Sequence, residues 1–344
     1  MKKIGWVIGI LAITLLIAGG FVNTSEASQG KVWKLKGSCF FPPSGARWDN
    51  GMQFIKKVKE RTNGRVVIDL VPSGGLAPVR EEYEHLGKKL IDFALGADAF
   101  IGAIRNAFGI FNVPGVNAKD APALLKAGVL DVFNRVAKKD KVKFISGWQS
   151  LGYQAIATRK KFIKKPADFK GAMFFAQGPF FDKAVDAFGA KPTPVPVAEL
   201  YTGLQTGVVD GIITTVSALQ SFKIAEVCPY SSIFPGSANL GFFAYLPAFN
   251  LEVWNSFPAD IQKIILQAGA EVAEQSLANW SKGRKKTEAF LKSKSDRVFT
   301  YELSENEAKA FIETVREPVK EFYLKRGGQD EKDIYAIIDK FYGR

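Results

Sequence analysis

Residues 165–215 read KPADFKGAMFFAQGPFFDKAVDAFGAKPTPVPVAELYTGLQTGVVDGIITT, and their pattern decides the fold. A Pro-Ala-Asp-Phe-Lys-Gly turn leads into an apolar run at 172–176, and a helical stretch follows. A second strand-like run then occupies residues 192–197. A further helical stretch ends at the Asp210-Gly211 turn, which opens a last apolar run. Short strands that alternate with helices in this way predict a compact β-α-β-α-β unit.

The chain before this unit predicts a second α/β body. A strand at 32–39, a helix at 49–61 and a strand at 65–71 form an opening β-α-β unit. Apolar residues alternate in the strands and recur at helical spacing between them. A short apolar strand at 91–95 and a helix at 121–138 follow. With 344 residues, the chain is long enough for two domains with separate cores.

The chain after the unit returns to the first body. An apolar run at 238–254 suits a strand that passes from one lobe to the other, and Pro247 keeps it from being a regular interior strand throughout. Pro258 opens a long amphipathic helix at 259–292, and Ser304 begins a capping box for another helix.

These elements predict an α/β protein of two lobes joined by crossing strands. The first lobe is expected to comprise residues 28–150 with about 240–285, and the second 151–239 with about 286–344. Ligands of open α/β sheets bind beyond the carboxyl ends of the strands. A cleft between the lobes is therefore the expected site.

The first 27 residues are expected to be a cleaved export signal. Two lysines precede an apolar run at 4–18, and the small-x-small sequence at 25–27 places cleavage after Ala27. An uncleaved membrane anchor is the alternative, but the apolar run is short for a membrane span. We therefore expect a periplasmic protein.

The formal net charge of +13 does not indicate a nucleic-acid-binding protein. Clustered Lys and Arg are needed to release counterions from a polyanion, whereas the basic residues here are scattered beside acidic ones, as at 56–60. No nucleic-acid-binding motif accompanies them. A solvated basic surface is expected.

Four motifs occur in a characteristic order: T-N-G-R-V at 62–66, K-P-A-D-F-K-G at 165–171, E-L-Y-T-G-L-Q-T-G-V-V-D-G at 199–211 and S-F-P-A-D-I-Q-K-I-I at 256–265. In order and spacing the chain resembles the extracytoplasmic solute-binding proteins of TRAP transporters, the DctP-like family, over nearly all of its length after the signal segment. The resemblance implies a periplasmic binding protein-like fold, with two lobes braced by a long C-terminal helix. It also implies delivery of a small organic acid to TRAP membrane permease subunits. We expect a monomer without a cofactor.

The resemblance also points to ligand-binding positions, and the chain departs from the family at one of them. Phe175 stands where the family carries an arginine that clamps a substrate carboxylate, and Thr214 stands where an asparagine commonly faces the ligand. A phenyl ring cannot form a bidentate salt bridge. Either another arginine meets the anion of the solute, or the solute is less acidic and more apolar than the family norm. The candidate arginines are Arg47, Arg80, Arg105 and Arg159.

Aromatic and polar residues near the strand ends complete the predicted site, since a binding cleft needs a few polar groups within an apolar wall. Gln177 lies on the same strand face as Phe175, and Tyr201 lies one helical turn before Gln205. Packing in the core is the alternative role for each aromatic residue. The predicted ligand-binding residues are Phe41, Trp48, Trp148, Arg159, Phe175, Gln177, Tyr201 and Thr214.

Few residues suit catalysis. His85 is the only histidine, which excludes a zinc site with several imidazoles, and it shares a charged helical face with Glu82 and Glu84. Neither a Walker A sequence nor a G-x-G-x-x-G fingerprint occurs. We expect no enzymatic activity. The alternatives are a periplasmic enzyme that uses His85 or a carboxylate pair such as Glu81 and Glu82, and an aromatic-rich carrier of lipid-like molecules.

Cys39 and Cys228 are the only cysteines. In an oxidising compartment they could form a disulfide that restricts the unfolded chain. Two buried thiols are the alternative, and the sequence does not decide between them.

Overall fold

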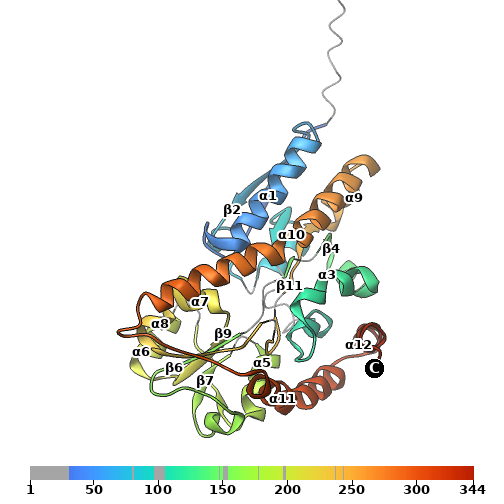
Figure 1. Cartoon of the computed structure of the whole chain (residues 1–344). Helices are drawn as coiled ribbons and strands as arrows, with labels where there is room; N and C mark the ends of the chain where they lie inside the picture. The colour runs from blue at the N-terminus through green and yellow to red at the C-terminus, as the bar shows by residue number, and fades with distance from the viewer. Residues whose placement is uncertain are drawn as a thin grey trace, which may run out of the picture.

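The computed structural model describes residues 31–79, 81–96, 105–146, 148–149, 154–176, 178–196, 199–236, 238–242 and 244–344, with only the backbone given at 148–149. Two mixed sheets, each covered by helices, form two lobes, and the 34-residue helix α10 (Ala259–Lys292) runs along both (Figure 1). The predicted two-lobe α/β architecture with a long bracing helix is confirmed.

The sheet of the first lobe has five strands: β1 (Trp33–Ser38), β2 (Val66–Val71), β3 (Phe93–Leu95), β4 (Val142–Phe144) and β12 (Pro247–Asn250). Their order is β2-β1-β3-β12-β4, with β1 parallel to both of its neighbours and β12 antiparallel to β3 and β4. The predicted break at Pro247 is the start of an interior strand. A first strand position tolerates proline, although proline has no N–H for the ladder.

Helix α1 (Gly45–Arg61) connects β1 to β2, as the opening β-α-β pattern predicted. Phe54, Ile55 and Val58 recur at helical spacing and are buried. The helix begins four residues before the predicted start at 49, and Arg47 therefore lies in its first turn.

The sheet of the second lobe has six strands: β6 (Ala155–Thr158), β7 (Met173–Phe175), β8 (Lys191–Pro192), β9 (Gly211–Thr214), β10 (Tyr230–Ile233) and β13 (Phe299–Glu302). Their order is β13-β10-β6-β9-β7-β8. With α5 (Pro179–Ala187) and α6 (Leu200–Thr206), residues 165–215 supply β7, α5, β8, α6 and β9 in turn. This confirms the predicted β-α-β-α-β unit.

The Asp210-Gly211 pair begins β9 and joins it to β7. The Asp210 carboxylate accepts a hydrogen bond from the backbone N–H of Met173 at 2.9 Å, and the Asp210 N–H donates to the Met173 carbonyl at 2.7 Å. A Cβ at Gly211 would lie 2.6 Å from the carbonyl oxygen of Ala157. Glycine is therefore required where β9 enters the sheet between β6 and β7.

Two crossing segments join the lobes. The chain passes from β4 to β6 through β5 (Trp148–Gln149), and from β10 back to β12 through β11 (Ala244–Tyr245). The two short strands pair antiparallel with each other, with Tyr245 opposite Trp148. Together with α10, this pair connects the two sheets.

The remaining helices lie around the sheets: α2 (Glu82–Gly87), η2 (Asn106–Asn112), η3 (Ala118–Asp120), α3 (Ala121–Leu124), η4 (Leu125–Val129), α4 (Leu130–Ala137), η5 (Lys138–Asp140), η6 (Pro166–Phe169), α7 (Val216–Ser221), α8 (Ile224–Val227), α9 (Leu251–Ser256), α11 (Glu305–Arg326) and α12 (Gln329–Tyr342). The helix predicted at 121–138 is divided into α3, η4, α4 and part of η5. Its interruption falls at Gly128, whose φ of 129° is not helical. The predicted capping box of α11 is present, because the Ser304 hydroxyl accepts from the Glu307 N–H.

The C-terminal helices lie on different lobes. Helix α11 packs against α5 of the second lobe, whereas α12 contacts α4 and η2 of the first. Arg135 of α4 forms ion pairs of 2.7 and 2.5 Å with Asp330 and Asp333 of α12. The sequence-based division placed all of 286–344 in the second lobe, but α12 packs on the first, because ion pairs and side-chain packing hold it there.

The cores of the lobes are not separate, contrary to the expectation from chain length. One hydrophobic cluster extends from the first sheet to Phe174, Phe180 and Phe311 of the second lobe, and a smaller cluster lies within the second lobe. At the junction, a Cβ on Gly109 of η2 would lie 2.0 Å from the ring of Phe180. Glycine at this position lets the ring pack directly against the η2 backbone.

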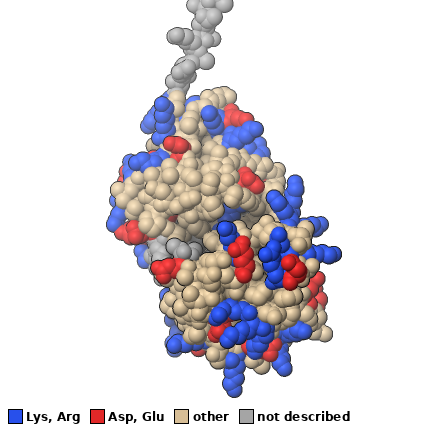
Figure 2. Space-filling model, turned by 90° about the vertical axis from the view of Figure 1, so that its left-hand side faces the viewer, with Lys and Arg blue, Asp and Glu red and all other residues tan. Residues whose placement is uncertain are grey.

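Lys and Arg are interspersed with Asp and Glu on the face of the molecule seen in Figure 2. This distribution agrees with the expected solvated basic surface. Among the helices of the described residues, none combines the length and the apolar character needed to cross a membrane.

Candidate functional site

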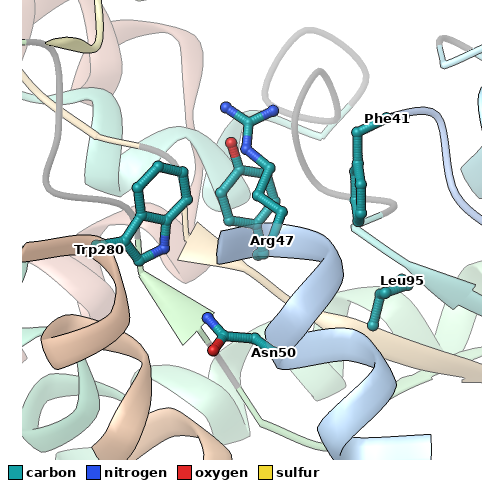
Figure 3. A pocket seen from close by; sticks show the side chains of 6 residues that line it. Phe41, Arg47, Asn50, Leu95 and Trp280 are labelled. Carbon is teal, nitrogen blue, oxygen red and sulfur yellow. The ribbon is translucent and has the colours of Figure 1, made fainter. Parts of the chain in front are cut away.

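A small hollow lies beyond the carboxyl ends of β1 and β3, where α1, α10 and the crossing strand β11 meet (Figure 3). Its volume is about 220 Å³, part of which is open to solvent. It is lined by Phe41, Arg47, Asn50, Leu95, Tyr245 and Trp280.

Arg47 lies in the middle of this hollow against two aromatic rings. Its guanidinium carbon is 4.6 Å from the centroid of the Tyr245 ring and 5.6 Å from that of the Trp280 ring. The two rings are nearly parallel, with 6.3 Å between their centroids. A guanidinium that stacks on an aromatic face keeps its N–H donors free at its edge. None of the ion pairs among the described residues includes Arg47.

Two further donors lie beside Arg47. The indole N–H of Trp280 is buried and has no hydrogen-bond acceptor among the described residues. Asn50 is buried, and its amide oxygen accepts from the Asn279 amide at 2.6 Å, which leaves the Asn50 amide nitrogen toward Trp280 (Figure 3). A buried donor without an acceptor is costly unless a ligand supplies one. The donor set favours an acceptor-rich or anionic group.

Of the predicted residues of the first lobe, Phe41 is among those that line the hollow, and it is buried. Trp48 is half-buried against the core, next to Arg47 in α1. The backbone of Trp148 pairs with that of Tyr245 in β5 and β11, and its side chain lies outside the described part. Gln177 also lies outside the described residues.

Phe175 and Thr214 lie at the carboxyl ends of the parallel strands β7 and β9. Phe175 is buried in the cluster of the second lobe, together with Leu204 and Ile212. Thr214 is buried opposite Ala155 of β6. Neither residue is among those that line the hollow.

Tyr201 and Arg159 lie elsewhere on the second lobe. The Tyr201 hydroxyl is 3.4 Å from the Glu226 carboxylate, on the outer side of α6. Arg159 follows β6 beside Gly207, where a Cβ on that glycine would meet its guanidinium. Arg159 thus lies at the opposite end of β6 and β9 from Thr214, about 13 Å along the strands by their rise per residue. The structure does not bring these residues together.

Of the three candidate arginines that the structure describes, Arg47 is the one that lines the hollow. Arg105 forms a bidentate ion pair with Asp140, with N···O distances of 2.8 and 2.5 Å. Arg159 lies beside Gly207, and Arg80 lies outside the described residues.

Sequence reasoning missed most of the lining of the hollow. Trp280 and Tyr245 fell within apolar patterns that predicted core packing, and they are indeed almost fully buried. One signal was available: Arg47 and Asn50 are spaced i and i+3, which places both on one side of α1 directly after the loop that ends β1.

The residues considered for catalysis do not form a catalytic group. His85 Nε2 lies 3.7 Å from the carboxylate of Glu81, one turn earlier in the chain. Glu82 points the other way and is fully buried, so the neighbouring acids do not act as a pair.

The two-lobed α/β fold, with two crossing segments and a long helix that connects the sheets, is that of a solute-binding protein. The chain belongs to the bacterial extracellular solute-binding proteins of family 7, the DctP family, whose model matches residues 48–326. The resemblance identified from the motifs is therefore confirmed. This family consists of transport proteins rather than enzymes, and the chain is accordingly an extracytoplasmic solute-binding protein of the TRAP type.

Named relatives cover almost the whole chain. The C4-dicarboxylate-binding periplasmic protein DctP of Rhodobacter capsulatus is 25% identical over 334 residues, which are 96% of either chain. A TRAP periplasmic solute-binding protein from Desulfovibrio salexigens, solved with bound orotic acid, is 27% identical with a TM-score of 0.81, covering 91% of this chain and 99% of that one. The ectoine-binding protein of Halomonas elongata has the same fold, at 19% identity, a TM-score of 0.77 and coverage of 89% and 97%.

Proposed function

We propose that this protein binds a small, relatively apolar or aromatic organic acid between its lobes and delivers it to TRAP membrane permease subunits. Arg47 takes the part that the family assigns to the arginine absent at Phe175. The observation that carries this proposal is the position of Arg47, stacked on Tyr245 and Trp280 with no carboxylate partner in the described part of the chain.

The surroundings of Arg47 support an anionic group with an apolar body. Its guanidinium presents a planar set of donors that matches a carboxylate. The indole N–H of Trp280 and the amide of Asn50 add donors, and Phe41 and Leu95 supply apolar surface. Closure of the second lobe would cover this wall with the strand ends at Phe175 and Thr214.

A thermal-shift screen tests the proposal. A ligand that binds the folded state raises the unfolding temperature as its concentration exceeds Kd. The screen compares orotate, pyroglutamate, 2-acetolactate and glucuronate, which structurally similar proteins bind, with aromatic and aliphatic monocarboxylates and their neutral amides. We expect one or more carboxylates to stabilise the protein while the matching amides do not. Stabilisation by the amides alone, or by no member of the screen, would refute the proposal.

Export and assembly also belong to the proposal. Cleavage after Ala27 lies outside the described residues, and mass spectrometry of the exported chain would locate it. Delivery to the permease is implied by the family, and co-purification with the permease subunits tests it. The monomeric state is our expectation from the resemblance, and light scattering tests it.

A further inference from the structure

Arg284 of α10 lies one helical turn after Trp280 and is almost fully engaged by hydrogen bonds. Its Nε donates to the Glu288 carboxylate at 2.6 Å. Its Nη1 donates to the side-chain oxygen of Gln154 at 3.1 Å and to the carbonyl of Gly236 at 3.0 Å, and its Nη2 donates to the carbonyl of Phe234 at 3.1 Å. The side chain is only 13% exposed.

These acceptors belong to both segments that cross between the lobes. Gln154 precedes β6 at the end of the first crossing, and Phe234 and Gly236 follow β10 at the start of the second. Gln154 is itself buried, and its amide nitrogen donates to the carbonyls of Gly236 and Ala238, each at 3.0 Å. Arg284 therefore ties the long helix and both crossing segments into one network.

On the side of the first lobe, α10 is held by a separate set of contacts with α1. Glu271 forms ion pairs with Lys57 and Arg61 at 2.8 and 2.7 Å. Farther along α10, Gln275 accepts a hydrogen bond from Gln53, and Asn279 donates one to Asn50. In addition, the buried hydroxyl of Ser146 on the first crossing donates to the carbonyl of Gly269 at 3.1 Å. The first lobe is thus fixed along the N-terminal part of α10, and the crossings enter the second lobe at Arg284.

We propose that Arg284 is a hinge clamp: it sets the angle between the lobes by holding both crossing segments against α10. A planar guanidinium has N–H donors in several directions, so it can bind three acceptors on two segments at once. A methionine fills similar space without donors, and a lysine presents a single ammonium. The expected effect of replacing Arg284 on the angle between the lobes does not depend on the proposed function, whereas any effect on solute affinity does.

The test measures the interlobe distance in the free protein, so no ligand is needed. Spin labels are attached at Lys59→Cys on α1 and Lys191→Cys on β8, both exposed positions, while the native cysteines are buried. Pulsed electron resonance then gives the distance distribution for Arg284→Met, Arg284→Lys and the matched control Lys285→Met on the exposed face of the same helix.

We expect Arg284→Met to broaden the distribution or shift its mean by more than about 2 Å, the scale of domain rearrangements. Arg284→Lys should give an intermediate distribution, and Lys285→Met should match the wild type. A distribution for Arg284→Met equal to that of the wild type overturns the clamp. If circular dichroism shows that Arg284→Met is unfolded, Gln154→Leu decides, because it removes the hydrogen bond of Arg284 to the first crossing segment and the hydrogen bonds of Gln154 to the second. An unchanged distribution in Gln154→Leu then overturns the proposal.

The distance measurement separates this inference from the proposed function, because it is made on the free protein and involves no solute. If no carboxylate stabilises the protein in the screen, the interlobe distances measured for the Arg284 variants still decide the hinge clamp. If those distances do not change, the screen still decides the proposed function.

Discussion

The guanidinium of Arg47 stacks on the ring of Tyr245 at 4.6 Å, which joins the first turn of α1 to a strand that crosses between the lobes. Some 200 residues separate the two in the chain. A solute anion held by Arg47 would therefore be bound directly beside the connection about which the lobes move.

Replacing Arg47 with Met should weaken binding of the carboxylate found in the screen. Loss of a charge-assisted hydrogen-bond pair costs about 2–3 kcal/mol, or roughly 30- to 150-fold in Kd. The affinity of Arg47→Lys should lie between those of the wild type and Arg47→Met, because an ammonium keeps the charge but loses the planar pair of donors. Isothermal titration calorimetry measures the change.

The exposed Arg297 provides a control for the loss of one positive charge. Arg297→Met should keep the wild-type affinity. Equal affinities for Arg47→Met and the wild type would show that Arg47 does not meet the solute.

Phe175→Ala should lower the free energy of unfolding. The ring is 4% exposed and packs with Leu204 and Ile212, so truncation leaves a cavity that costs about 3–5 kcal/mol of unfolding free energy. Urea unfolding measures this cost. A large loss of solute affinity with little loss of stability would instead place Phe175 in the ligand site, as its position in the family pattern implied.

Glu82 should make the protein less stable as pH rises. Its side chain is fully buried, and neither carboxylate oxygen accepts a hydrogen bond within the described part of the chain. Burial raises the pKa of Glu82 from 4.5 to about 7, and the nearby Ser38 hydroxyl opposes this only in part. Because the folded state holds the proton more tightly, its stabilising effect is full below pH 4.5 and is lost as pH rises toward 7. The loss is on the order of 3 kcal/mol.

Urea unfolding of the wild type and Glu82→Gln across this pH range checks the sign. The uncharged amide cannot ionise, so the unfolding free energy of the variant should lack the part of the pH dependence that Glu82 causes. Parallel pH profiles for the two proteins would show that Glu82 does not titrate in this range.

Cys39 and Cys228 should behave as inert thiols. They are free in the structure and lie in different hydrophobic clusters. Burial raises the pKa of each thiol to about 12, which leaves almost no reactive thiolate at neutral pH. We expect no reaction of the native protein with Ellman's reagent and two thiols per chain in denaturant without reductant. Absence of thiols in denaturant would reveal a disulfide.

Much of the fold follows from local patterns that the sequence carries. The helix predicted at 259–292 forms over those residues, and the unit at 165–215 forms its three strands and two helices in the expected order. Helical periodicity, an initial Pro258 and the Ser304 cap act within a few residues. Such signals do not depend on the rest of the structure.

The lining of the hollow could not be predicted in the same way. In β7 both faces are buried, with Phe174 in one hydrophobic cluster and Phe175 in the other. A strand covered on both sides has no polar alternation, so its sequence does not tell which side faces a cleft. The family pattern pointed to Phe175, whereas the hollow contains Arg47, which forms no ion pair with the residues that the structure describes.

The order of the elements and the four motifs were enough to predict the α/β class and the family, and the resemblance implied a carboxylate-clamping arginine where this chain has Phe175. Only the tertiary structure decided that Arg47, Tyr245 and Trp280 meet, that α12 returns to the first lobe and that Arg284 holds both crossings. The difference lies in how far apart in the chain the interacting residues are. Helix and strand formation depends on close neighbours, whereas stacking, ion pairing and hinge contacts depend on how distant elements pack.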